Sequence, residues 1–317
     1  MAVEWKMFWQ ATHNFQLSYI KWVFNPPWAL VLLWPISGLP LYSSWGLLVC
    51  ITVLAAAALI PHRFGFAVRV VWLSLTIFSY PFVRQIIEGN IEVLVLIGFL
   101  LLSHGLSRQN PWSLAASLIF FSSKIQMSWL FILALLPFLW YHWPLAKLVR
   151  SAGAILIFCI PFLLWRGDEW WSMLRVFPKE SPYNLSLMAS LLRFGVSSWL
   201  ASMGWFSLFA ATIWLVYRLR LLSPEKYAGI LVAVSLLLAP YAGNSTLIAV
   251  LILGVVPYAA EKPWPRIFLM LLYYLPLVMV WDFRILDVYA YFSAVVLLTA
   301  IVLALNELHG HEVVAQI

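Results

Sequence analysis

Charged and amide side chains interrupt the apolar stretches of this sequence at two places. Glu88 and Glu92 lie at the junction of two long apolar runs, and Lys124 and Gln126 interrupt another run further along the chain. A charge close to hydrocarbon costs roughly a few kcal/mol, so such residues usually face a cavity or a partner and mark a functional site. A carboxylate there can act as a general base toward an acceptor hydroxyl, and a lysine can hold a phosphate oxygen as a point charge.

The candidate site comprises four polar clusters that the distribution of charges places on one side of a membrane. Amides in these clusters could bind sugar hydroxyls, so a cavity lined by carboxylates, a lysine and amides suits a polar ligand that carries a phosphate. The candidate catalytic residues are Glu88 and Glu92, and the candidate substrate-binding residues are Arg84, Asn90, Lys124, Gln126, Asn184, Ser186 and Asn244.

Each of these residues also has a purely structural interpretation. Glu92 could form an ion pair with a cation of a neighbouring helix, and Glu88 could be a solvated loop residue. Lys124 could extend to the membrane interface, and Asn184 and Asn244 could cap the short helices that follow them. The histidines and cysteines lack metal-ligand spacing, so we predict neither a metal site nor a cofactor.

The composition indicates a membrane protein. Of the 317 residues, 64% are hydrophobic and only 10% are charged, whereas an ordinary globular domain is about a quarter charged. Residues 1–24 mix charged and aromatic side chains and lack the apolar core and cleavage site of a signal peptide. The net charge of +7 includes no long basic run. We therefore expect membrane lipids as partners and no nucleic acid.

Runs of apolar residues predict an all-α, polytopic transmembrane helical bundle of about eleven spans. A further run, 27–42, is interrupted by prolines and a glycine and is predicted to be re-entrant or interfacial. We expect an amphipathic N-terminal segment over 1–26, a transmembrane domain over 27–305 and a cytoplasmic tail over 306–317. The predicted spans are 43–61, 66–83, 91–104, 112–123, 128–141, 148–165, 197–217, 227–240, 247–260, 267–281 and 288–305.

Charges in alternate loops predict the orientation of the spans. One set of loops is short and basic, and the positive-inside rule makes it cytoplasmic. The opposite set carries most of the carboxylates and is external, including a long loop over 166–196. This loop contains Trp170-Trp171, which suits an interfacial anchor, and a short amphipathic helix over 184–193. The basic set contains Arg63, Arg108, Lys147, Arg150, Arg218, Arg220, Lys226, Lys262 and Arg266, with Glu225 and Glu261.

Five short motifs lie in order between residues 25 and 250. They are Asn25-Pro26-Pro27-Trp28, Gly89-Asn90-Ile91-Glu92, Lys124-Ile125-Gln126, Asn184-Leu185-Ser186-Leu187 and Ala239-Pro240-Tyr241-Ala242-Gly243-Asn244. Together they resemble the Tyr-Pro-Pro-Leu, Gly-Gln-Val-Asn, Lys-Pro-Gln, Asn-Gln-Ser-Leu and Ser-Pro motifs of glycosyltransferase family 87. Members of this family belong to the GT-C superfamily and depend on polyprenyl-phosphate sugars.

The resemblance implies a GT-C-like fold and an integral, multi-pass protein of a bacterial plasma membrane. It implies transfer of a sugar, commonly mannose, from a polyprenyl-phosphate donor to a lipid or glycan acceptor on the external face. It also implies an inverting displacement, with an aspartate of the first external loop as general base. This chain departs from the family there, because the only acid before Pro26 is Glu4. The histidine often seen after the late Ser-Pro motif is also missing.

Three explanations of the missing aspartate stay open. The recorded sequence could start after the family's first transmembrane helix and its catalytic loop. Alternatively, the base could have moved, with Glu88 or Glu92 as the nearest candidates. Finally, the protein could be a catalytically silent relative that binds or transports a lipid-linked glycan or serves in an assembly. Under each explanation the expected ligand is a polyprenyl-phosphate-linked sugar, and the sequence specifies neither the sugar, the acceptor nor an oligomeric state.

Overall fold

Helices are the only regular elements in the part of the chain that the computed structural model describes, which is residues 3–14, 25–175, 184–219, 222–243, 246–261, 263–278 and 288–315. The prediction of an all-helical protein is therefore confirmed for these residues. The chain divides into two compact units. Unit 1 comprises Met1–Leu59, Arg84–Ile125 and Leu139–Pro178, and unit 2 comprises Ile60–Val83, Gln126–Phe138 and Lys179–Ile317.

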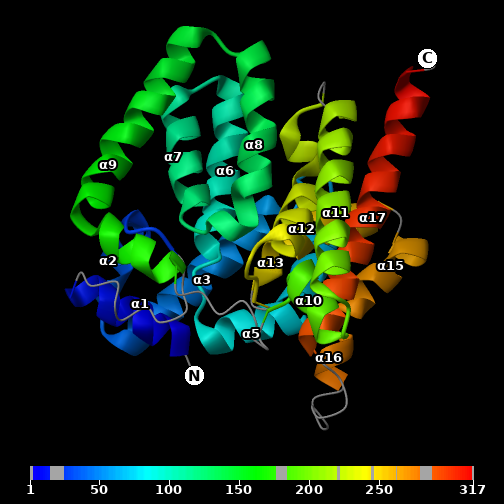
Figure 1. Cartoon of the computed structure of the whole chain (residues 1–317), viewed down its shortest axis with the longest axis horizontal. Coiled ribbons are helices and arrows are strands. Elements are labelled where there is room, and N and C mark those ends of the chain that lie inside the picture. The colour runs from blue at the N-terminus through cyan, green and yellow to red at the C-terminus, as the bar shows by residue number, and fades with distance from the viewer. Residues whose placement is uncertain are drawn as a thin grey trace. The chain divides into compact units, whose positions relative to one another are not determined.

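Unit 1 is organised around an antiparallel helix pair. Its helices are α1 (Val3–Asn14), α2 (Trp28–Ser37), α3 (Leu41–Leu59), the last turn of α5 (Tyr80–Glu88), α6 (Val93–Arg108), α7 (Pro111–Ser122) and α9 (Leu145–Arg175). α6 and α7 lie side by side (Figure 1), α6 also packs on α3, and α7 on α9. The side chain of Asn110 caps α7 by accepting a hydrogen bond from the backbone N–H of Trp112 at 3.0 Å, and α7 therefore starts directly after the turn.

Unit 2 is built around α12, a helix that is buried on all sides. The unit contains α4 (Phe66–Ile77), most of α8 (Ile125–His142), α10 (Leu187–Arg193), α11 (Ser198–Arg218), η2 (Pro224–Tyr227), α12 (Ala228–Leu238), α13 (Ile248–Val250), η4 (Leu251–Val255), α14 (Val256–Glu261), α15 (Pro263–Leu272), α16 (Leu275–Val278) and α17 (Val288–Ala315). Every residue of α12 is buried, as its all-round apolar sequence predicts. A Cβ on Gly229 would lie 2.4 Å from the Cα of Gly254, so α12 approaches η4 at backbone contact distance.

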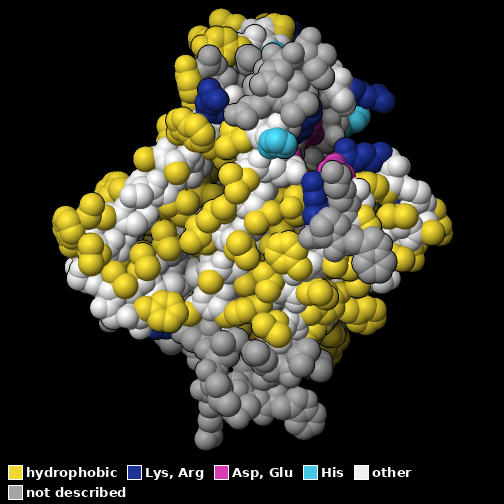
Figure 2. Space-filling model, turned by 90° about the vertical axis from the view of Figure 1, so that its right-hand side faces the viewer, with side chains coloured by type: hydrophobic (Ala, Val, Ile, Leu, Met, Phe, Trp, Pro, Cys, Tyr) yellow, Lys and Arg dark blue, Asp and Glu magenta, His cyan; other side chains and the backbone are white. Residues whose placement is uncertain are grey.

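Several helices are suited to a membrane. Among the described residues, five are long and apolar enough to cross one, or six if the bent pair α4–α5 forms a single span. Protein covers little of some of them, since only 11% of the span window in α9 and 17% in α11 is buried. Apolar surface this extensive is atypical of a soluble protein. Figure 2 shows a face on which hydrophobic side chains form a broad area, with Lys and Arg side chains gathered toward one end. These features are compatible with an integral membrane protein.

The helices differ from the predicted spans at several positions. The run 66–83 is bent by 62° between α4 and α5, because Pro81 has no N–H to donate to the carbonyl of Ile77, the last residue of α4, and its ring would clash with that carbonyl in a continuous helix. The run 267–281 is divided between α15 and α16. The segment predicted to be re-entrant or interfacial contains α2, which at 10 residues is too short to cross a bilayer. The prediction of about eleven spans is not confirmed.

Two of the predicted segment boundaries also differ from the structure. Residues 166–175, predicted as external loop, continue α9, which has 31 residues. No proline lies in this stretch, and Arg166 pairs with Glu169 one turn later, which favours helix. At the C-terminus, α17 runs without a break through the predicted boundary at 305. The predicted helix within 184–193 is present as α10.

Candidate functional site

A sharp turn between α5 and α6 positions the first of the predicted site residues. α5 ends at Glu88, and Gly89 follows with φ of +72°, a conformation that residues with a Cβ rarely adopt. A Cβ at this position would also lie 2.4 Å from the Cβ of Trp5 in α1. The Trp5 indole N–H in turn donates to Ser44 Oγ at 2.9 Å. Glycine therefore allows the turn and lets α1 lie directly against it.

The turn brings Asn90 to Lys124. Lys124 precedes α8, and its Nζ donates a hydrogen bond to Asn90 Oδ1. The backbone carbonyl of Asn90 accepts a second hydrogen bond, from Gln85 Nε2 at 2.7 Å. Lys124 is 2% exposed and Asn90 is 6% exposed. The lysine is thus buried within unit 1, and the interpretation that it extends to the membrane interface is wrong.

Three carboxyl groups act electrostatically on the buried lysine. Glu92 is fully buried at the start of α6, and Glu88 forms an ion pair with Arg84 one turn earlier on α5. Burial lowers the pKa of Lys124, while the negative charges of Glu92, Glu4 and Glu88 oppose that effect. Glu88, Glu92 and Lys124 therefore lie close enough to act on one another electrostatically.

Glu4 is the member of this group that the sequence analysis did not include. It lies in α1, and burial raises the pKa of its carboxyl group from 4.5 to about 7. The charge of Glu88 raises this pKa further, whereas Lys124 and Arg84 lower it. A sequence signal was available: Glu4, Phe8 and Ala11 follow the i, i+4, i+7 spacing of one helical face, and Phe8 and Ala11 are buried.

We call Glu4, Arg84, Glu88, Glu92 and Lys124 the charged cluster; its polar neighbours are Gln85 and Asn90. The three carboxylates and two cations give a formal charge of −1 when all are ionised and 0 when Glu4 holds its proton. A cluster with this balance does not attract an anion as a whole. It can, however, accept a proton near neutral pH, because one of its carboxyl groups has a pKa close to 7.

Asn184 and Ser186 have structural roles in unit 2. Asn184 Oδ1 accepts hydrogen bonds from the backbone N–H groups of Ser186 and Ala242, each at 3.0 Å, and Asn184 Nδ2 donates to the Pro240 carbonyl at 2.9 Å. Ser186 Oγ caps α10 by accepting from the Ala189 N–H. These bonds join Asn184 to Pro240 and Ala242, but they leave it little capacity for a ligand.

Two further predicted positions are Gln126 and Asn244. Gln126, at the start of α8, has a buried Oε1 with no hydrogen-bond partner in the described part of the chain. Asn244 lies outside the described residues. Searching the described ranges reveals no group of three or more His, Cys, Asp or Glu side chains arranged to hold a metal ion.

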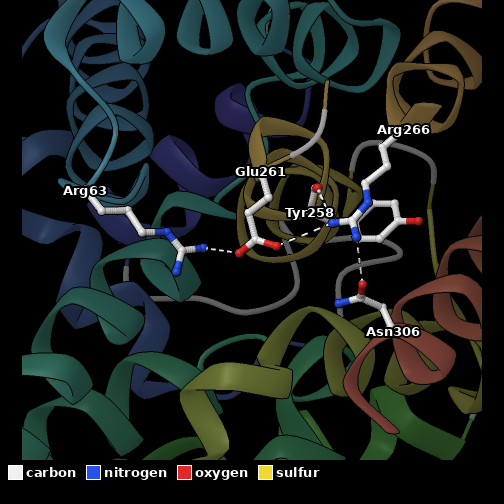
Figure 3. Close-up of polar contacts among 5 residues, drawn as sticks. All are labelled: Arg63, Tyr258, Glu261, Arg266 and Asn306. Carbon is white, nitrogen blue, oxygen red and sulfur yellow. Dashed lines mark hydrogen bonds and ion pairs between the residues drawn. The ribbon is translucent and has the colours of Figure 1, made fainter. Parts of the chain in front are cut away.

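A separate polar network joins three helices of unit 2 (Figure 3). Arg266 of α15 lies over the Tyr258 ring, 4.2 Å from its centroid, and donates to the Tyr258 carbonyl and to Asn306 Oδ1, each at 3.0 Å. Glu261 accepts from both Arg266 and Arg63. The charge pattern predicted that Arg63, Glu261 and Arg266 share the cytoplasmic side, and the three do lie together. Their bonds fix α14, α15 and α17 to one another.

Comparison with known proteins gives no relative for this chain. No family model matches it, and no curated protein or solved structure matches it either.

Proposed function

We propose that this protein is a membrane glycosyltransferase that transfers a sugar from a polyprenyl-phosphate donor to a hydroxyl group of a lipid or glycan acceptor. The observation that supports it best is Glu4, a partly buried carboxyl group with a pKa of about 7 beside Lys124 and Arg84. A general base works best when its pKa lies near the operating pH. Glu4 thus offers the base that the motif comparison found missing, without requiring Glu88 or Glu92 to supply it.

In the proposed reaction, ionised Glu4 takes the proton of the acceptor hydroxyl as its oxygen attacks the anomeric carbon of the donor sugar. The bond between that carbon and the phosphate oxygen breaks, and polyprenyl phosphate leaves with the electron pair. The base and the leaving phosphate lie on opposite sides of the anomeric carbon, so its configuration is inverted. Glu4 then releases its proton to solvent.

Arg84 and Lys124 have different roles in the proposed reaction. The Arg84 side chain is 35% exposed, so it is the cation that a donor phosphate could reach, and it would offset the charge of the leaving group. Lys124 is buried against Asn90 and three carboxyl groups, so its charge holds the cluster together. This assignment moves the phosphate contact from Lys124 to Arg84 and keeps Asn90 as a positioning residue.

The finer features of the proposal follow from the sequence motifs. They are a GT-C-like arrangement of about eleven spans, a site on the external face, mannose as the donor sugar and a bacterial plasma membrane as the location. Within unit 1, the Glu88–Glu92 turn and Lys124 come together at the same end of the α6–α7 pair, which is consistent with one external site.

Radiolabelled sugar transfer tests the proposal. The full chain, reconstituted in lipid nanodiscs, is supplied with polyprenyl-phosphate mannose and a lipid extract as acceptor. We expect transfer that increases with pH as Glu4 ionises near 7, and a loss of about 100-fold or more on Glu4→Gln, as is usual when a general base is removed. Glu225→Gln, which changes a carboxyl group of unit 2, is the matched control and should keep full activity.

The outcomes distinguish an enzyme from a catalytically silent protein that only binds the donor or serves in an assembly. Binding of the donor without transfer by the wild type, under conditions where a control glycosyltransferase is active, would indicate a binding or assembly component instead. Undiminished transfer by Glu4→Gln would remove Glu4 from the mechanism and return Glu88 and Glu92 as the candidates for the base.

A further inference from the structure

Two neighbouring residues of α5 each have a buried polar atom without a hydrogen-bond partner. These atoms are Gln85 Oε1 and Arg84 Nε, and neither has a partner among the described residues. Buried polar atoms in folded proteins are paired in roughly nine cases out of ten. Two such atoms at consecutive positions, both within the charged cluster and its neighbours, leave this turn of α5 able to bind a polar group from outside the chain.

The orientation of the Gln85 amide follows from its hydrogen bond to Asn90. The carbonyl oxygen of Asn90 can only accept, so the Gln85 atom that contacts it at 2.7 Å must be the nitrogen. Gln85 Oε1 is therefore the atom left for another partner, and that partner must be a donor. The residue Gln85 is 3% exposed. The donor must therefore enter a site from which bulk water is largely excluded.

The charge balance decides which kind of donor fits. The charged cluster has a formal charge between −1 and 0, so it gives a phosphate no net attraction, and a further cation would meet Arg84 and Lys124. A neutral hydroxyl group carries a donor for Gln85 Oε1 and lone pairs for Arg84, at no cost in net charge. The arrangement suits an alcohol better than either ion.

We propose that Gln85 accepts a hydrogen bond from a hydroxyl group of a substrate sugar. The donor's phosphate would then lie outside the cluster, toward the exposed part of Arg84. This inference rests on the proposed function for the identity of the sugar, but it concerns binding and does not depend on transfer. It assigns sugar recognition to Gln85, in addition to the amides that the sequence motifs indicated.

Binding to the full chain in nanodiscs tests the assignment with three probes. Polyprenyl-phosphate mannose carries both groups, bare polyprenyl phosphate lacks the sugar, and octyl mannoside represents an acceptor. The variants are Gln85→Met, which has similar shape and no oxygen acceptor, and Gln85→Glu, which keeps an oxygen acceptor; both lose the donor to the Asn90 carbonyl, so their comparison tests the acceptor. The control is Gln109→Met at the opposite end of α6. A neutral hydrogen bond contributes up to roughly a tenfold change in affinity.

We expect Gln85→Met to weaken one of the two mannose probes about tenfold and to leave bare polyprenyl phosphate unchanged. Gln85→Glu should retain at least part of the affinity for that probe, and Gln109→Met should match the wild type. The probe that weakens identifies the hydroxyl as that of the donor or of the acceptor. Unchanged affinity for both mannose probes, or equal weakening of bare polyprenyl phosphate, would overturn the assignment. So would wild-type protein that binds neither mannose probe.

The hydroxyl site at Gln85 and the proposed enzymatic function can be refuted independently of each other. Loss of mannose affinity in Gln85→Met without any transfer by the wild type supports the hydroxyl site and refutes the enzyme. Normal transfer by the wild type, with unchanged binding by Gln85→Met, supports the enzyme and refutes the hydroxyl site.

Discussion

Replacing Glu4 by glutamine removes a carboxyl group whose pKa the fold raises from 4.5 to about 7. Below pH 4.5 this group is protonated in both the folded and the unfolded chain. As the pH rises, the unfolded chain ionises first and the folded protein keeps the proton until about pH 7. The free energy of unfolding therefore falls between these values. At about 1.36 kcal/mol per pKa unit, the total decrease is about 3 kcal/mol.

The titration of Lys124 changes the free energy of unfolding with the opposite sign. Its folded-state pKa is lowered by burial, so as the pH rises the folded protein loses this proton before the unfolded chain does, and the loss adds stability. The wild type alone would therefore report a mixture of two effects. The difference between the wild type and Glu4→Gln reports the titration of Glu4 together with its effect on Lys124, because the negative charge of Glu4 raises the pKa of Lys124.

Thermal unfolding in detergent, followed by intrinsic tryptophan fluorescence from pH 4 to pH 9, provides the measurement. We expect Glu4→Gln to be about as stable as the wild type at pH 4 and more stable by about 3 kcal/mol at pH 9. Over the same range, the transfer rate of the wild type should rise. Glu225→Gln should follow the wild type throughout. Parallel stability curves for the wild type and Glu4→Gln would refute the burial of Glu4 and, with it, the argument for its role as base.

Three further substitutions test the positions of individual residues. Gly89→Ala should lower the free energy of unfolding in urea by roughly 2–5 kcal/mol, because φ is +72° and the new Cβ would overlap the side chain of Trp5. The control Gly153→Ala, where nothing lies within 4 Å of the new Cβ, should not destabilise. Equal effects of the two substitutions would contradict the tight turn. Lys124→Met should destabilise by roughly 3–5 kcal/mol at pH 8 and by less at pH 5, where Glu4 is protonated; an equal loss at both pH values would contradict the charged cluster. Asn184→Ala should lower the free energy of unfolding by roughly 2–4 kcal/mol, because it leaves buried backbone donors unpaired. The affinity for polyprenyl-phosphate mannose should stay the same. A weaker affinity would restore Asn184 to the substrate site.

The sequence drew attention to some residues of the charged cluster and missed Glu4. Glu92 and Lys124 stood out because charges are rare in apolar runs, and the hydrogen bond between Asn90 and Lys124 follows from two helices joined by a short turn. Glu4 did not stand out, because its environment depends on α1 packing against Gly89, a contact between segments far apart in the sequence. Local patterns record which face of a helix is apolar, but they do not record what that face covers.

The misplaced boundaries have local causes. Pro81 was visible in the sequence, and its effect on the helix before it would have divided the run 66–83. The continuation of α9 beyond residue 165 was harder to predict, since Arg166, Asp168 and Glu169 read as loop residues by their charge alone. Their spacing within one helical turn allows the ion pair between Arg166 and Glu169, and a charged stretch with such pairs is compatible with helix.

The length of α9 sets a relation between this protein and the thickness of its host bilayer. At about 1.5 Å per residue, Leu145–Trp165 rises about 31 Å, which matches a hydrocarbon core of about 30 Å, and the rest of the helix extends about 15 Å further. A thinner bilayer is accommodated when such a helix tilts. α9 packs on α7, and α7 ends two residues before Lys124. In a bilayer, we therefore expect a tilt of α9 to act on α7, the helix that precedes Lys124, so that lipid chain length affects the geometry of the charged cluster.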